Sequence, residues 1–344
     1  MKRPGQPSAV AIGLVTAVAA GAVGLLAATG FDVSLALTAL VRGALGSWYA
    51  IGSGTLVRST PLILTGLAVA LAFRAGVFNI GAEGQFLAGA AAGVAAALAG
   101  RHAQSWLLVV SVLFAGMLAG ALWAGIAAVL RLRFHVLEVI STIMLNFVAA
   151  DIVSYLVRGP LQEPTHIYPQ TETIATHAQL PRLGATTRLH LGFVIAVLAC
   201  AAAWWWVGFT AGGFRLRAVG ANPHAARSAG QIDVDRVTTR AFLVSGAIAG
   251  LAGAIEVAGV TYALYENISP GYGYTAIAVA LLARLNPAIV IGTGILFGAL
   301  ESGAAAMQRD AGVPSVVVSV VEAGIILALV ALERLRSRSR LATV

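Results

Sequence analysis

Long stretches without a single charged side chain recur along the whole chain, and they constrain the fold more than any other feature. Ala103–Leu130, for example, contains no Asp, Glu, Lys or Arg. A helix of about 20 apolar residues crosses the hydrocarbon core of a bilayer, and it satisfies its own backbone hydrogen bonds there. Runs of this length predict membrane-spanning helices.

Composition extends that prediction to the whole molecule. Hydrophobic residues make up 59% of the 344 residues and charged residues only 10%, whereas a typical soluble domain has roughly 25% charged residues. The composition excludes a soluble enzyme, a secreted disulfide scaffold, a disordered chain and a coiled coil. We therefore predict an all-α, polytopic integral membrane helical bundle with about ten transmembrane or re-entrant helices, N-in and C-in.

The predicted spans are the uncharged or nearly uncharged stretches. Several are shorter than a full crossing, so we expect tilted, broken or re-entrant segments among them. The ten predicted spans are Pro4–Phe31, Ser59–Phe73, Gly84–Gly100, Ala103–Leu130, Val139–Val157, Leu191–Gly208, Ala241–Val260, Tyr274–Ala283, Pro287–Leu300 and Ser315–Leu332. Asp32–Val57 is moderately apolar and fits either a span or a helix at the membrane surface.

The positions of the basic residues predict the orientation. Cytoplasmic loops carry an excess of Lys and Arg, and cytoplasmic termini place most of the 22 basic residues inside. Residues 158–190 are then an external loop, 212–240 a cytoplasmic loop and 334–344 a basic cytoplasmic tail. We interpret the arginines of the tail as anchors near anionic membrane lipid, and we expect no nucleic-acid partner despite the net charge of +8.

The cytoplasmic loop contains the pattern of a short capped helix. Asn222 suits the N-cap, Pro223 suits the first helical position and Gly230 suits the end of the helix. Such a helix can dock into a groove on a cytoplasmic partner, or it can be a connector without a partner. The residues by themselves leave both readings open.

A second polar segment, residues 74–86, lies between two predicted spans. Asn79 and Glu83 are four residues apart and would share one face of a helix, but the glycines of this segment favour a broken helix with close backbone approach. Broken helices with convergent polar groups line the path in many transporters. The alternative is a tight cytoplasmic turn in which Glu83 offsets Arg74.

Other polar groups admit two interpretations each. Asp151, Glu256 and Glu322 lie within predicted spans and are either a proton relay, as in a secondary transporter acting alone, or helix-packing partners. Tyr272 and Tyr274 belong to a tyrosine cluster that either anchors the membrane interface or stacks on a ring-shaped substrate. The histidines lack metal-site spacing. The chain has no phosphate-binding loop, so any ATP must bind another chain.

Four segments resemble ABC-importer permease subunits of the branched-chain amino acid, simple-sugar and nucleoside group. They occur in order over roughly residues 58–300, and the first is most similar to the nucleoside (guanosine-type) branch. The segments are Phe78–Phe86 (FNIGAEGQF), Glu138–Asn146 (EVISTIMLN), Gly220–Gly230 (GANPHAARSAG) and Gly271–Ala283 (GYGYTAIAVALLA), the last followed by Asn286-Pro287.

The resemblance implies a single transmembrane permease domain, 1–344, in the bacterial inner membrane. Such a subunit is not an enzyme and holds no cofactor or metal. Its expected partners are a second permease chain (identical or a paralogue), a cytoplasmic ATP-binding subunit that carries ATP and magnesium, and an external substrate-binding lipoprotein. The implied substrates are nucleosides or related ring-shaped polar solutes, with simple sugars such as ribose or branched-chain amino acids as alternatives.

The resemblance also implies two sets of site residues. The candidate substrate-pathway residues are Asn79, Glu83, Gln85, Asn146, Tyr272 and Tyr274. The candidate residues for coupling to the ATP-binding subunit are Gly220, Asn222, Pro223, Ala226, Arg227 and Gly230.

Overall fold

The computed structural model describes residues 20–21, 24, 26–28, 30–230, 232–314, 316–317, 319–320 and 323–324. Their secondary structure is helical apart from two isolated β-bridges in loops, as expected for an all-α protein. The elements are α2 (Val33–Leu45), the π-helix η1 (Ala50–Thr55), α3 (Leu56–Arg74), α4 (Ala82–Ala99), α5 (Ser105–Phe134), α6 (Glu138–Arg158), the 3-10 turn η2 (Thr176–Ala178), α7 (Leu191–Phe209), α8 (Ala211–Ala221), α9 (Pro223–Ser228), α10 (Val234–Glu256), the π-helix η3 (Val257–Thr261), α11 (Tyr272–Leu282) and α12 (Pro287–Ala311).

Seven helices of the described part are long and apolar enough to cross a membrane. They coincide with seven of the predicted spans, and their ranges are Ala50–Arg74, Ala82–Ala99, Trp106–Phe134, Glu138–Arg158, Leu191–Phe209, Val234–Thr261 and Pro287–Ala311. The eighth predicted span corresponds to α11, whose 11 residues are too few for a full crossing. The predicted spans Pro4–Phe31 and Ser315–Leu332 lie largely outside the described residues, and so does the tail 334–344. The count of about ten therefore stays a prediction.

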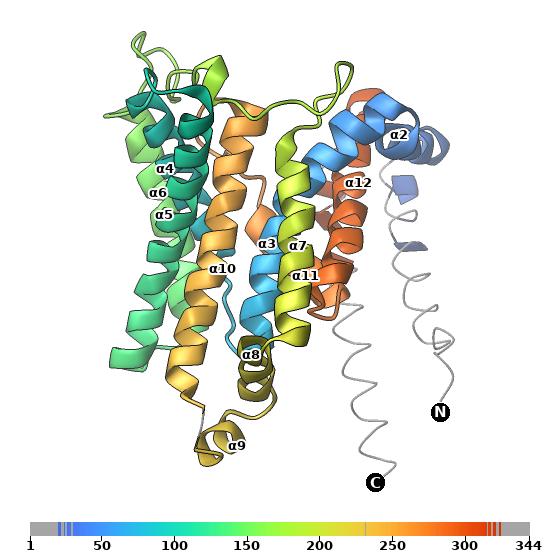
Figure 1. Cartoon of the computed structure of the whole chain (residues 1–344). Helices are drawn as coiled ribbons and strands as arrows, with labels where there is room; N and C mark the ends of the chain where they lie inside the picture. The colour runs from blue at the N-terminus through green and yellow to red at the C-terminus, as the bar shows by residue number, and fades with distance from the viewer. Residues whose placement is uncertain are drawn as a thin grey trace. The chain divides into compact units, whose positions relative to one another are not determined.

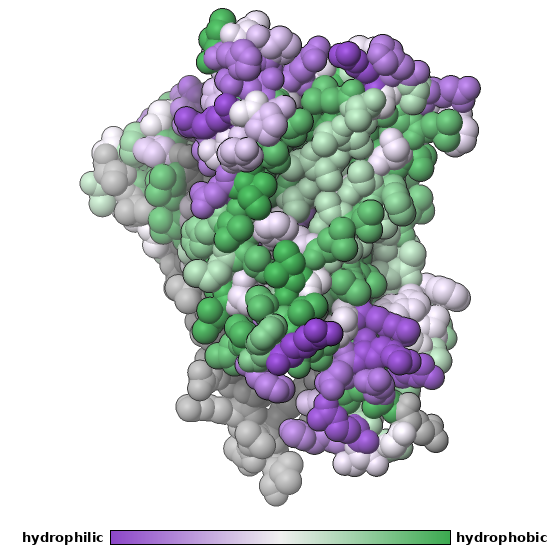
Figure 2. All heavy atoms as spheres, turned by 90° about the vertical axis from the view of Figure 1, so that its left-hand side faces the viewer, coloured by the Kyte–Doolittle hydropathy of each residue, from purple (hydrophilic) through white to green (hydrophobic). Residues whose placement is uncertain are grey.

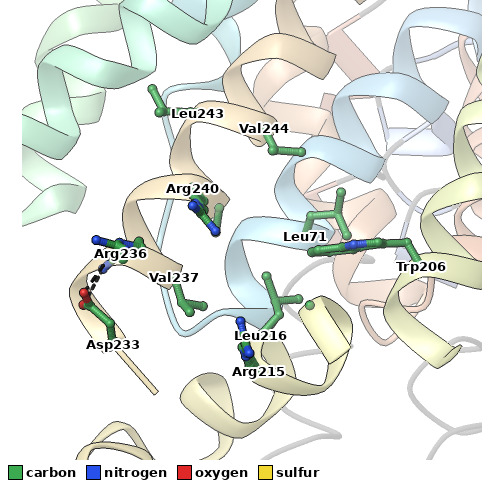
Figure 3. A pocket seen from close by; sticks show the side chains of 12 residues that line it. Leu71, Trp206, Arg215, Leu216, Asp233, Arg236, Val237, Arg240, Leu243 and Val244 are labelled. Atoms are coloured by element: carbon green, nitrogen blue, oxygen red, sulfur yellow. Dashed lines mark hydrogen bonds and ion pairs between the residues drawn. The ribbon is translucent and has the colours of Figure 1, made fainter. Parts of the chain in front are cut away.

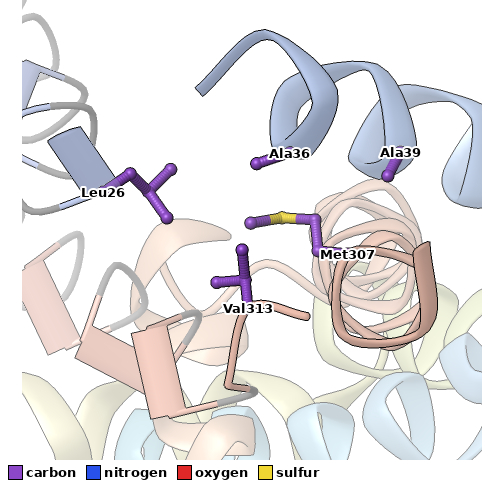
Figure 4. Close-up of a cluster of buried hydrophobic side chains, with 5 residues drawn as sticks. All are labelled: Leu26, Ala36, Ala39, Met307 and Val313. Carbon is purple, nitrogen blue, oxygen red and sulfur yellow. The ribbon is translucent and has the colours of Figure 1, made fainter. Parts of the chain in front are cut away.

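The chain divides into two compact units. The first comprises Met1–Thr55 and Gly298–Val344, and the second comprises Leu56–Phe297. In the first unit, the ambiguous segment Asp32–Val57 forms α2, whose 13 residues are too short to span a bilayer, and then η1. Figure 4 shows the buried apolar cluster of this unit, formed by Leu26, Ala36, Ala39, Met307 and Val313.

The second unit is a helical bundle (Figure 1). Its helices α3, α4 and α10 are mostly buried, and α5, α6 and α7 are mostly exposed. Figure 2 views the side of α4, α5 and α6, where a broad apolar belt separates hydrophilic side chains at the two ends. Large apolar side chains such as Phe114, Leu122 and Phe147 are exposed on α5 and α6. An apolar belt of this kind suits contact with lipid or with another membrane chain.

Glycines allow α4, α5 and α10 to pack with their backbones in close approach. A Cβ on Gly250 of α10 would overlap with the backbone of Gly116 and Gly120 in α5, and a Cβ on Gly89 of α4 would overlap with Gly250. Small residues at helix crossings are the usual means of tight packing in membranes. Contact at these glycines fixes the positions of α4, α5 and α10 relative to one another, and so the positions of the polar residues that they carry.

The two ends of the bundle differ. The loop between α6 and α7 lies at one end and pairs with the segment after α10, since Leu180 N–H donates to the Ala258 carbonyl and Ile174 N–H to the Tyr262 carbonyl, each at 2.8 Å. α8 and α9 project from the opposite end (Figure 1). Residues 212–240, expected as a loop, consist of most of α8, all of α9 and the first turns of α10.

Candidate functional site

A cavity of about 370 Å³ lies between α4, α6 and the segment that leads into α11. Pockets of this size can hold a small polar solute. Its polar lining residues are Glu83, Asn146, Asp151, Ser154, Glu266, Asn267, Ser269 and Tyr274. Three predicted pathway residues, Glu83, Asn146 and Tyr274, are therefore brought together at one surface, although they come from three different helices.

Glu83 connects the first turn of α4 to the start of α11. Its Oε2 accepts a 2.6 Å hydrogen bond from the backbone N–H of Gly273, and the Ser269 hydroxyl also hydrogen-bonds to its carboxyl group. The Ser269 Oγ accepts the backbone N–H groups of Gly271 and Tyr272, each at 3.1 Å. The N-terminal N–H groups of a helix have no partners within the helix, and at α11 these two side chains supply acceptors.

Asn146 of α6 fixes the turn that precedes α4. Its Oδ1 accepts the Gly84 backbone N–H at 2.8 Å, and its Nδ2 donates to the Ile80 carbonyl at 3.0 Å and to the Tyr274 hydroxyl at 3.4 Å. The side chain is almost fully buried. Asn146 thus contacts both α4 and α11 and forms part of the cavity wall.

Asn79 and Gln85 form a buried amide pair beside the cavity, and neither lines it. Asn79 Nδ2 donates to Gln85 Oε1 at 3.0 Å and to Ser245 Oγ at 2.9 Å, while Asn79 Oδ1 accepts from Gln85 Nε2 at 3.0 Å and from the Gly81 N–H at 2.9 Å. All four hydrogen-bonding positions of the Asn79 amide are filled. These hydrogen bonds hold the 75–81 turn against α4 and α10.

The expected break in the helix is confirmed, so Asn79 and Glu83 do not share a helix face as they would on a continuous helix. α4 begins at Ala82, so Asn79 lies in the preceding turn and the spacing of a continuous helix does not apply. Asn79 faces Ser245 of α10 and Glu83 faces Gly273 of α11. Glu83 does not pair with Arg74, whose guanidinium donates to the Leu285 carbonyl at 2.9 Å.

The tyrosines have different surroundings. Tyr272 is buried, and its ring packs edge-to-face on Phe86 with the centroids 5.7 Å apart. Tyr274 lines the cavity and leaves 43% of its surface exposed. Only the second ring is therefore available to a solute in the cavity.

One edge of the cavity carries an ion pair. The Arg158 guanidinium donates to both oxygens of Glu266, at 2.6 and 2.9 Å. These bonds, together with one from Ser154, hold the pKa of Glu266 at about 2, well below its usual range. Glu266 is therefore ionised, and its charge is compensated by Arg158.

Two of the predicted intramembrane acids, Asp151 and Glu256, have different surroundings. Asp151 lines the cavity and forms no ion pair within the described part of the chain. Glu256 is buried and interacts electrostatically with Arg58 and Arg188, and Glu322 falls outside the described residues. Residues 30–230 and 232–314, like the other described positions, contain no cluster of three or more His, Cys, Asp or Glu side chains that could hold a metal ion.

At the opposite end, the predicted capped helix is confirmed as α9. Asn222 is its N-cap and accepts the Ala225 N–H at 3.0 Å, Pro223 is its first residue, and Gly230 follows it with a φ of 71°. Ala226 is buried against Val219 and Val234, and Arg227 forms an exposed ion pair with Asp235 at 3.1 Å.

Gly220 links this end to the polar turn. A Cβ at this position of α8 would overlap with the carbonyl of Arg74, the last residue of α3. The turn of residues 75–81 begins directly after Arg74 and leads to Glu83. Backbone contact at Gly220 thus joins α8, which leads into α9, to the chain that forms the cavity wall.

Sequence reasoning missed the segment Glu266–Ser269 as part of the site. Its signal was a run of polar residues, Glu266, Asn267 and Ser269, directly before the Pro270-Gly271 turn. Their role depends on a position next to α6, because Ser154 and Arg158 supply the partners of Glu266.

Comparison with known proteins agrees with this architecture. Residues 51–330 match the family described as branched-chain amino acid transport system / permease component. The chain is 39% identical over 322 residues to the guanosine ABC transporter permease protein NupP of Bacillus subtilis, covering 92% of this chain and 90% of that protein.

Two further relatives cover most of the chain. The glucose ABC transporter permease protein of Haloferax volcanii is 40% identical over 81% of this chain and 75% of its own length. The nucleoside ABC transporter permease protein NupB of Lactococcus lactis is 33% identical over 88% of this chain and 85% of its own length. The chain is a multi-pass protein of the cell membrane, and it belongs to the family of branched-chain amino acid transport system permease components.

Proposed function

We propose that this chain forms the membrane pathway of an ABC importer for nucleosides. The observation that carries the proposal is the cavity in which the Phe78–Phe86 and Gly271–Ala283 segments meet through the Glu83–Gly273 hydrogen bond. Two of the relatives described above are named for guanosine or nucleosides. The expected pathway residues are Asn79, Glu83, Gln85, Asn146, Tyr272 and Tyr274, of which Asn79 and Gln85 act by holding the wall.

The cavity chemistry suits an uncharged, hydroxylated ring compound. Asn267 offers hydrogen bonds, and the exposed ring of Tyr274 offers a stacking surface for a planar base. Asp151 brings a carboxylate without a paired cation in the described part of the chain. A carboxylate accepts hydrogen bonds from hydroxyl and ring N–H groups and repels phosphates, so we expect nucleosides to be accepted and nucleotides rejected.

A second candidate substrate is a simple sugar. The relative from Haloferax volcanii is named for glucose and matches at 40% identity. Sugar hydroxyls would use the same polar side chains but would gain less from Tyr274, since they lack a planar base.

The transport cycle requires other chains. We expect a second permease subunit, a cytoplasmic subunit that binds ATP and magnesium, and an external substrate-binding lipoprotein. The end that carries α8 and α9 would face the cytoplasm, because most arginines of Leu56–Phe297 lie there. This is the orientation expected for an N-in, C-in bundle of about ten spans.

The contacts suggest how ATP-driven motion would reach the cavity. A movement of α9 would shift α8, and the backbone contact between Gly220 and Arg74 would pass that shift to the 75–81 turn. That turn is tied to Asn146 through the Ile80 carbonyl and to the cavity through Glu83. Rigid elements joined in this way can convert a small displacement at one site into opening at another.

Uptake by the whole transporter in proteoliposomes tests the proposal. The complex, with ATP inside and its binding lipoprotein outside, should accumulate radiolabelled guanosine, and unlabelled guanosine 5′-phosphate should not compete. Asp151→Asn should lower guanosine uptake several-fold, whereas Asp310→Asn, which removes an exposed carboxylate in α12, should leave it unchanged. ATP-dependent uptake of glucose without any uptake of nucleosides would favour the sugar importer.

A further inference from the structure

A groove of about 490 Å³ lies between the α7–α8 corner and the first turns of α10, and it shares no lining residue with the cavity beside α11 (Figure 3). One part of its wall is cationic and the other is apolar. The residues that define this character are Arg215, Arg236, Arg240, Trp206, Leu243 and Val244.

The charges of the groove do not cancel. Asp233 lies 3.7 Å from the Arg236 guanidinium and also accepts the Arg236 backbone N–H at 2.9 Å, so this pair is internally compensated. Within the described part of the chain, Arg215 and Arg240 form no ion pair. Both are exposed and both line the groove. The groove therefore presents two uncompensated guanidinium groups.

The order of residues along α10 gives the groove a direction. This helix belongs to an apolar segment of spanning length that begins at Val234, so its first turns lie at the edge of that segment. Arg236 and Arg240 are four residues apart on one face, and Val244 follows four residues later, about 6 Å further along the helix axis at 1.5 Å per residue. In Figure 3, Leu243 and Val244 accordingly lie on the side of the groove away from Arg215.

We propose that this groove binds one anionic membrane phospholipid. The phosphate would lie between Arg215 and Arg240, because guanidinium groups bind phosphate with paired, charge-assisted hydrogen bonds. An acyl chain would follow the exposed apolar side chains of Leu243 and Val244, and the Trp206 ring would lie at the level of the glycerol backbone, where tryptophan is favoured. The cationic-to-apolar order of the groove matches the order of groups in a phospholipid.

A bound lipid would connect α8 to α10. These helices directly precede and follow α9, and they enclose the groove from two sides. The lipid would therefore brace the corner of the bundle that carries the capped helix. This assignment does not depend on which solute the protein transports.

Native mass spectrometry of the purified full-length chain tests the site, with phosphatidylglycerol and phosphatidylcholine as probes. We expect one phosphatidylglycerol to be retained at energies that remove phosphatidylcholine, and phosphatidylglycerol to raise the thermal unfolding midpoint. The double variant Arg215→Gln, Arg240→Gln should weaken phosphatidylglycerol binding at least tenfold. Arg133→Gln removes an exposed arginine outside the groove at the end of α5. This variant should bind phosphatidylglycerol as tightly as the unmodified protein does.

A second variant tests the apolar part without changing the charge. Val244→Trp fills the groove beyond the arginines and should also displace the lipid, while the protein keeps its gel-filtration profile. Equal retention of the two lipids, or full retention by the double variant, overturns the proposal. An equal rise in the unfolding midpoint with inorganic phosphate alone would identify a free-anion site instead. Crosslinking of Val244→Cys to another transporter subunit, and not to a lipid-borne probe, would identify a protein interface.

Discussion

The carboxylate of Glu83 accepts a 2.6 Å hydrogen bond from the backbone N–H of Gly273, which joins the first turns of α4 and α11. A Cβ on Gly273 would overlap with the backbone of Glu83, so the two helices approach as closely as their backbones allow. A carboxylate is favoured at a helix N-terminus, where the free N–H groups carry positive partial charge. Glu83 therefore fixes the start of α11 at the wall of the cavity.

Replacing Glu83 by alanine should destabilise the protein and impair uptake. The buried Gly273 N–H would lose its acceptor, which costs about 1–3 kcal/mol. Glu83→Gln retains an acceptor oxygen and should lose less than half as much. The thermal unfolding midpoint in detergent and guanosine uptake in proteoliposomes measure the two effects, and Glu172→Ala, at an exposed site in the α6–α7 loop, serves as the control. Identical midpoints for all three variants would contradict this role.

Asn79→Leu should be among the most destabilising substitutions in the bundle. It removes four hydrogen bonds and leaves the Gln85 amide and the Gly81 N–H buried without their partner. We expect a loss of about 3 kcal/mol or more in the free energy of unfolding. Gln104→Ala removes an exposed amide that makes no capping bond and should change stability by less than about 0.5 kcal/mol. A stable Asn79→Leu protein that fails only in transport would instead indicate direct contact with substrate.

Gly220→Ala should disrupt the packing of α8 on α3. The added methyl group would overlap with the Arg74 carbonyl, so one of the two helices must shift. Overpacking of this kind costs about 1–3 kcal/mol, and ATP-driven uptake should fall more than stability does. Gly208→Ala is the matched control, because open space surrounds that position of α7 and alanine favours a helix. If both variants transport at the same rate, the Gly220 contact does not carry motion.

His190 should make stability depend on pH below neutrality. It is fully buried at the N-cap of α7, and burial, together with the nearby Arg188, lowers its pKa from 6.5 to about 4. Because the unfolded chain takes up the proton first, this contribution is complete above about pH 6.5 and is lost as the pH falls toward 4. A pKa shift of this size corresponds to a change of about 3 kcal/mol in the free energy of unfolding. Unfolding midpoints measured from pH 7.5 to 4.5 should show the decline.

His190→Asn isolates this effect. The asparagine can still accept the Gly192 N–H that His190 Nδ1 accepts, and it does not titrate in this range. The variant should therefore show a flatter pH dependence, whereas His102→Asn, at an exposed position, should keep the slope of the unmodified protein. An unchanged slope in His190→Asn would assign the decline to another group.

Several features of the fold were predictable because they depend on neighbouring residues. Seven uncharged or nearly uncharged runs became helices of spanning length, since hydropathy acts within one segment. The α9 helix was predicted to begin after Asn222 for a similar reason, because a cap needs only a side chain and an N–H three residues away. The glycines after Arg74 correctly indicated a break before α4.

The functions of the polar residues were less predictable. The glycines indicated that the helix is broken near Asn79 and Glu83, but they did not indicate the partners, which lie on two different helices at Ser245 and at Gly273. Glu266 was not recognised, because its partner Arg158 is 108 residues away in the chain. Residues so far apart in the sequence leave no local pattern from which their pairing could be predicted.

The sequence by itself determined that this chain is a bundle of membrane helices with a capped helix, α9, between two of them. Hydropathy and capping decide these features within a single helix or its first turn. Only the tertiary structure decided that Glu83, Asn146 and Tyr274 share one cavity, and that Asn79 and Gln85 support it from behind. The reason is packing: glycines such as Gly250 and Gly273 let backbones approach closely, and that approach selects which buried polar groups can satisfy one another.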